Sequence, residues 1–134
     1  MAKLTKIEGV DEKTAQKLRD TGIRTTGALA KQGNTASGRN EIAKTTRIPA
    51  ETILHWVQQI DLLRVSGVGP EYAVLLLDAG FSDITELGKN EPEHVYRKLA
   101  RLNQEEHRVR KPPTRYQIND WIKQARRLSA SIEY

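Results

Sequence analysis

The sequence of 134 residues contains no cysteine. This absence excludes disulfide scaffolds, zinc–thiolate sites, iron–sulfur clusters and cysteine nucleophiles. Aromatic residues make up only 5% of the chain, and the β-branched and aromatic runs that favour strands are nearly absent. No apolar stretch approaches the roughly 20 residues that span a bilayer, and the first residues lack the apolar run of a signal peptide. We therefore expect a soluble, cytoplasmic, all-α protein with no membrane partner.

The composition is that of a folded chain, with 37% hydrophobic and 29% charged residues. The net charge of +5 is compatible with a nucleic-acid partner. Residues 1–64 contain 11 basic and 7 acidic residues, residues 65–96 contain one and six, and residues 97–134 contain ten and four. An acidic block in the sequence thus separates two basic ones.

The second half of the chain repeats the first. Shifted by 58 residues, Leu4–Asp11 aligns with Leu62–Gly69. A second pair of similar segments, with a slightly larger offset, aligns Ile53–Gln59 with Ile118–Gln124. Two pairs of similar segments in the same order predict an internal duplication.

We place the first unit at 1–61 and the second at 62–134, and expect about eight helices that share one compact core. The expected helix starts are Asp11, Thr25 or Thr26, Ser37 and Pro49 in the first unit, and Gly69, Asp83, Pro92 and Thr114 in the second. Within the first unit, the helix over roughly 49–63 is expected to be the longest. Trp56 and Trp121 occupy matching places on apolar stripes, which predicts core anchors, with a partner-binding role as the alternative.

The most informative segment is Leu62–Ala73, where a helix ends, a tight turn follows and a new helix starts at once. Two glycines let the backbone bend sharply and approach a partner closely. The unpaired amides at the start of the second helix form an anion site. The segment resembles the helix-hairpin-helix motif. The resemblance implies that Ser66, Gly67, Val68 and Gly69 hold a backbone phosphate, so that phosphate and not base sequence is recognised.

The whole chain is similar to a bacterial family of stand-alone tandem helix-hairpin-helix proteins described as a domain of unknown function. The similarity covers nearly the full chain and implies the fold, but it brings no established activity. Its motifs are the Ile-Glu-Gly start, Thr-Gly-Ile-Arg-Thr-Thr, Ser-Gly-Arg, the two tryptophan helices, Val-Ser-Gly-Val-Gly and Leu-Asn-Gln-Glu.

Several residues of the two hairpins oppose phosphate binding. In the first hairpin Asp11 stands where the second has Gly69, and its carboxylate would cap the helix amides and repel a phosphate. In the second hairpin Pro70 removes one donor, and Glu71 is negative where DNA-binding members often have lysine or a small polar residue. The second turn is therefore either a phosphate contact or a purely structural corner.

A basic segment, His107–Arg115, lies between two expected helices and carries Arg108, Arg110, Lys111 and Arg115. It predicts either a polyanion-binding patch or a solvated connector. If the last two helices pack side by side, further basic residues could join the patch: Arg97, Lys98, Arg101, Arg126 and Arg127.

The chain has no recognisable catalytic or cofactor-binding set. His55, His94 and His107 lack the spacing of a helical metal pair, and no glycine-rich phosphate loop with Lys-Ser/Thr is present. We therefore expect a non-enzymatic module without metal or cofactor. Two functions remain open: weak, non-sequence-specific DNA binding through backbone phosphates, and a protein-interaction or scaffold role without DNA binding. The first predicts that binding falls steeply with salt.

Overall fold

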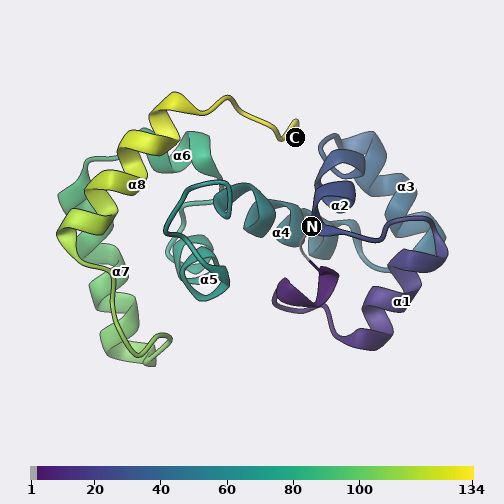
Figure 1. Ribbon diagram of the computed structural model, residues 1–134, viewed down its shortest axis with the longest axis horizontal. Helices are drawn as coiled ribbons and strands as arrows, with labels where there is room; N and C mark the ends of the chain where they lie inside the picture. The colour runs from purple at the N-terminus through teal and green to yellow at the C-terminus, as the bar shows by residue number, and fades with distance from the viewer. Residues whose placement is uncertain (1–2) are drawn as a thin grey trace. The chain divides into compact units, whose positions relative to one another are not determined.

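The computed structural model describes residues 3–134. This range contains eight α-helices, one short 3-10 helix and no strand (Figure 1). The all-α prediction is therefore confirmed. None of the helices in the described range is long and apolar enough to cross a membrane.

The chain divides into two compact units. Unit 1 runs to Asp61 and also takes in Ser131–Tyr134, and unit 2 is Leu62–Ala130. The sequence boundaries place the last four residues in the second unit, whereas their contacts are with unit 1. The sharing of one core between the units stays a prediction.

Unit 1 begins with a 3-10 helix and continues with four α-helices. Their bounds are η1 Leu4–Lys6, α1 Glu12–Asp20, α2 Thr26–Gln32, α3 Ala36–Thr46 and α4 Ala50–Leu62. The side chain of Asp11 caps α1, and that of Thr25 caps α2. The prediction that Ser37 caps α3 is wrong, because Thr35 Oγ1 accepts the Gly38 amide at 3.0 Å and Ser37 already lies inside the helix. Each cap gives a partner to a backbone donor that the helix start leaves unpaired.

Unit 2 begins with a turn over residues 63–69, called here the hairpin of unit 2; the matching turn around Gly9 is the hairpin of unit 1. Four α-helices follow the turn in unit 2, and α8 packs on α6 and α7 (Figure 1). Their bounds are α5 Pro70–Asp78, α6 Ile84–Gly88, α7 Pro92–Glu106 and α8 Arg115–Arg127. Thr114 and Gln117 form the expected capping box at the start of α8. In unit 1 the longest helix is α4 with 13 residues, as expected, and in unit 2 it is α7 with 15. Helix α7 ends at His107, whose backbone is in the left-handed region.

The two units repeat the same local backbone geometry at positions 58 residues apart. Gly9 and Gly67 have φ of 94° and 96°, and Gly22 and Gly80 have φ of 95° and 101°. After Gly22 and Gly80, the next amide donates to the carbonyl five residues earlier, at 3.1 and 2.9 Å. This bond is the one that closes a helix with a glycine in the left-handed region.

Each tryptophan packs against the hairpin glycine of its own unit. Trp56 is 3% exposed and Trp121 is 1% exposed, which confirms that both belong to the core. A Cβ atom at Gly9 would lie 3.0 Å from Nε1 of Trp56, and one at Gly67 would lie 3.1 Å from Nε1 of Trp121. A side chain at either turn would thus crowd the indole as well as strain the backbone, and both effects favour glycine.

Candidate functional site

The hairpin of unit 2 leaves the first amides of α5 without a side-chain cap. Gly69 is the N-cap in an extended conformation, and the proline that follows has no N–H. The next two amides, those of Glu71 and Tyr72, belong to the first turn, where the helix supplies no acceptor. Val68 is buried, and its own amide donates to the carbonyl of Val65 at 3.1 Å. The buried Val68 thus holds the turn against the core, while the first amides of α5 have no side-chain acceptor.

A glutamine on α8 holds the hairpin by its backbone. The amide of Ser66 donates to Oε1 of Gln124 at 2.9 Å, and Nε2 of Gln124 donates to the carbonyl of Ser66 at 3.0 Å. Unit 1 repeats this pair of bonds between Gln59 and Glu8, both at 3.0 Å. Sequence reasoning missed this role, although both glutamines stand three residues after the matching tryptophans in the second pair of aligned segments. Tryptophan and glutamine together fix each hairpin.

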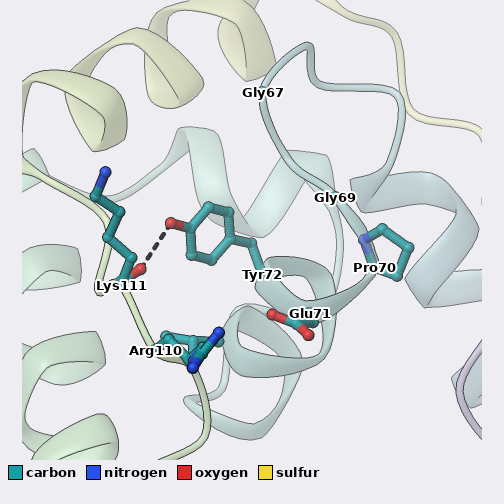
Figure 2. Close-up of a pocket in the computed structure, with 8 residues that line it drawn as sticks. Gly67, Gly69, Pro70, Glu71, Tyr72, Arg110 and Lys111 are labelled. Atoms are coloured by element: carbon teal, nitrogen blue, oxygen red, sulfur yellow. Dashed lines mark hydrogen bonds between the residues drawn. The ribbon is translucent and has the colours of Figure 1, made fainter.

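The hairpin and the basic segment of unit 2 meet in one groove. Figure 2 shows Gly67 and Gly69 on one side and Arg110 and Lys111 on the other. The groove has a volume of about 560 Å³. Two stretches that the sequence singled out separately therefore line the same surface.

Tyr72 ties the basic segment to the hairpin. Its hydroxyl donates to the carbonyl of Lys111 at 2.7 Å (Figure 2), and its ring centroid lies 5.2 Å from that of Trp121. The segment is also held from α7, since the amide of Val109 donates to Oδ1 of the buried Asn103 at 2.7 Å. The backbone that carries the two cations is thus anchored at both ends.

Two of the four predicted basic residues are engaged in ion pairs. Arg108 pairs with Asp78 and, at 3.1 Å, with Glu106, and the hydrogen bond to Asp78 raises the pKa of Arg108 above its ordinary value. Arg115 pairs with Glu93 at 3.0 Å. The hydrogen bond from Arg115 lowers the pKa of Glu93 below its ordinary value. Both arginines therefore already have anionic partners.

Arg110 and Lys111 differ from these two arginines. Both are exposed, and within residues 3–134 no ion pair involves either of them. Their charges face a groove in which the only carboxylate among its lining residues in the described chain is that of Glu71. The candidate site therefore combines two available cations with the helix start after Gly69.

The other basic residues of α7 and α8 add less free positive charge to the site than the sequence suggests. Helices α7 and α8 do pack side by side. However, Arg97 pairs with Glu93, Arg101 pairs with Glu105, and Nε of Arg126 donates to a backbone carbonyl of α6 at 2.8 Å. Most of this charge is therefore balanced or used within unit 2.

The hairpin of unit 1 has the opposite chemistry. The amide of Thr14 donates to Oδ1 of Asp11 at 2.8 Å, as expected from the sequence, and this bond lowers the pKa of Asp11 below its ordinary value. The cavity beside this hairpin has a volume of about 390 Å³ and is lined by Glu8 and Glu51 together with His55. Asp11 thus occupies the helix start that Gly69 leaves uncapped in unit 2, and two further carboxylates line the cavity beside the turn.

Two of the three histidines, His55 and His94, have side-chain contacts within their own units. Nδ1 of His55 lies 3.2 Å from Nε2 of Gln59, and the ring of His94 stands edge-on to that of Phe81 with centroids 6.1 Å apart. Over the described part of the chain, no group of three histidine, cysteine, aspartate or glutamate side chains is placed to hold a metal ion.

Comparison with a family model shows the family of this chain, whereas comparison with individual proteins does not. No curated protein and no solved structure matches the chain. One family model, described as a domain of unknown function (DUF4332), matches residues 8–128. This range includes Gly9 and Gly67, both tryptophans and the basic segment, so the chain belongs to the DUF4332 family.

Proposed function

We propose that the chain is a tandem helix-hairpin-helix protein without enzymatic activity, and that unit 2 binds DNA weakly through backbone phosphates. The observation that carries this proposal is the groove in which the hairpin meets Arg110 and Lys111. The tandem assignment is supported by the repeated positive-φ glycines and the two tryptophans. It is also supported by the paired hydrogen bonds of Gln59 with Glu8 and of Gln124 with Ser66, which we call the glutamine clamps.

The groove offers phosphate two kinds of attraction. Backbone N–H groups at a helix start point at an anion, and the helix dipole favours its negative charge. The two cations add charge that depends on neither base nor sequence. Since each neutralised phosphate contributes about −0.9 to the salt slope, two cations and the helix start predict a slope of about −2 to −3.

Glu71 opposes the same ligand. It lies in the first turn of α5 and lines the groove opposite Arg110 (Figure 2). A carboxylate at this place repels phosphate, so affinity is expected in the range of non-specific binding, about 10⁻⁴–10⁻⁶ M. Reversing this charge is therefore the most direct way to strengthen binding.

Fluorescence anisotropy with two labelled duplexes of unrelated sequence, at low and at physiological salt, tests the proposal. The double variant Arg110→Gln/Lys111→Gln should bind both duplexes less tightly to the same extent and reduce the salt slope by about 2. Its control is Arg97→Gln/Arg101→Gln, which removes the same charge from the exposed face of α7 and should change binding much less. Glu71→Lys should tighten binding and steepen the slope, whereas Glu41→Lys in unit 1, with the same charge change, should not.

Equal losses in the two double variants would show that net charge, and not the groove, attracts DNA. Absence of binding by the wild-type protein at low salt would refute DNA binding altogether. The alternative, a protein-interaction module that keeps the fold and does not bind DNA, would then be favoured.

A further inference from the structure

The last four residues have no regular secondary structure and belong to unit 1. The amide of Glu133 donates to the carbonyl of Asn34 at 2.6 Å. The hydroxyl of Ser131 donates to Oδ1 of Asp61 at 2.7 Å, and Nε2 of Gln58 donates to the hydroxyl of Tyr134 at 3.2 Å. Both main-chain and side-chain groups of the segment are thus bound.

A buried arginine forms the centre of this contact. Arg39 is only 5% exposed. Its Nη1 donates to the carbonyl of Gly33 at 2.8 Å, and its Nη2 donates to the carbonyl of Glu133 at the same distance. Because the carbonyl at the end of α2 orients the guanidinium, the second nitrogen is already directed at the segment. A preorganised donor of this kind loses little entropy when a ligand binds.

Unit 1 therefore binds both main-chain polar groups of a single residue. At residue 133 the N–H is bound by Asn34 and the C=O by Arg39, a pairing that does not depend on the side chain. The hydroxyl groups of Ser131 and Tyr134 add two side-chain contacts. Such a combination of main-chain bonds and spaced side-chain contacts is how proteins commonly bind extended peptides.

We propose that unit 1 carries a binding site for a short extended peptide, and that residues 131–134 of the same chain are its ligand. The chain leaves unit 1 after Asp61 and returns to it at Ser131. The site is therefore filled, within unit 1, by a stretch of chain that follows unit 2 in the sequence. This proposal is independent of DNA binding, because none of its residues lies in unit 2.

A full-length Glu133→Pro variant tests the proposal. Proline has no N–H to donate to Asn34, so the segment is weakened while the site itself is unchanged. A fluorescently labelled synthetic peptide of residues 128–134 should bind this variant saturably. It should bind the wild-type protein at least tenfold more weakly, because the site there is filled. The same peptide with proline at position 133 is the control and should not bind.

Two further variants, each made in the Glu133→Pro background, test the site residues. Arg39→Lys keeps the charge but cannot donate to two carbonyls in the same fork geometry, so peptide binding should be lost. Because Arg39 is buried, Gln58→Ala is the second test. It removes only the bond to the Tyr134 hydroxyl, and peptide affinity should fall about fivefold, the value of one net hydrogen bond.

Hydrogen exchange gives a readout in the unlabelled protein. The Glu133 amide should be protected from exchange in the wild type. In Gln58→Ala this amide should exchange faster, whereas the amides of α2 should keep their protection. Failure of the peptide to bind Glu133→Pro, or equal binding by the natural and proline peptides, would overturn the proposal. A wild-type dimer that Glu133→Pro abolishes would show that the segment binds a second copy, and would overturn the intramolecular assignment.

Discussion

Replacement of Gly67 by alanine should separate the two reasons for glycine in the hairpin of unit 2. The residue has φ of 96°, and an L-residue in the left-handed region costs about 1–2 kcal/mol. The new Cβ would also lie 3.1 Å from Nε1 of Trp121, whose ring is 1% exposed and cannot move freely. Overpacking of this kind costs about 1–3 kcal/mol. The expected loss of unfolding free energy is therefore about 2–5 kcal/mol.

Substitutions at two other glycines of unit 2 separate the backbone cost of a positive φ from the cost of crowding Trp121. Gly80 has φ of 101°, and its Cβ would meet only the end of the Lys98 side chain at 3.9 Å, so alanine there should cost about 1–2 kcal/mol from the backbone alone. Gly69 has φ of −89°, and its Cβ would meet nothing within 4 Å. Because glycine is preferred to alanine at an N-cap, alanine at Gly69 should cost no more than about 1 kcal/mol.

Urea unfolding followed by tryptophan fluorescence measures this series in a Trp56→Phe background, where the signal reports Trp121 alone. The expected order of destabilisation is Gly67→Ala, then Gly80→Ala, then Gly69→Ala. A Gly67 variant no less stable than the Gly80 variant would show that the indole does not confine the turn. Equal stability of all three variants would refute the strained geometry itself.

Three further predictions concern the elements that hold the hairpins. Trp121→Ala should destabilise the protein by about 3–5 kcal/mol, measured by the same unfolding assay followed by circular dichroism. Gln59→Ala should cost about 1–3 kcal/mol, and Gln124→Ala less, because Gln59 is 1% exposed whereas water reaches the partly exposed Gln124. Because the pKa of Asp11 is lowered in the folded state, the stability that this carboxylate contributes is present above the unfolded pKa of about 3.9 and is lost as pH falls through the folded value. Asp11→Asn should therefore flatten the dependence of the urea midpoint on pH below about pH 4, and an unchanged dependence would contradict the cap.

Local signals in the sequence were sufficient for most helix boundaries. Asp11, Thr25 and Thr114 are residue types whose side chains bond to helix amides, and each caps the helix expected of it. Ser37 has the same chemistry but lies two residues too late, because Thr35 already accepts a free amide in the first turn of α3. Propensity alone cannot rank two neighbouring caps.

The site was less predictable, because it depends on pairing between distant residues. The sequence assigned equal weight to Arg108, Arg110, Lys111 and Arg115, and only the fold brings Asp78 and Glu93 to the first and last of them. The glutamine clamps depend on the same kind of long-range contact. The signal for them existed in the aligned tryptophan helices, but a polar residue on an amphipathic helix ordinarily indicates a solvated face.

The difference between Asp11 and Gly69 bears directly on which hairpin binds phosphate. The two turns share their φ angle to within a few degrees, their tryptophan contact and their glutamine clamp, so the backbone does not distinguish them. A side-chain cap stabilises a helix by about 1 kcal/mol, and unit 2 lacks this stabilisation at a position where unit 1 has it. The uncapped helix start faces the groove that also holds two exposed cations. Phosphate would supply there the acceptor that Asp11 supplies in unit 1, and this substitution of ligand for side chain is why we assign the proposed binding to unit 2.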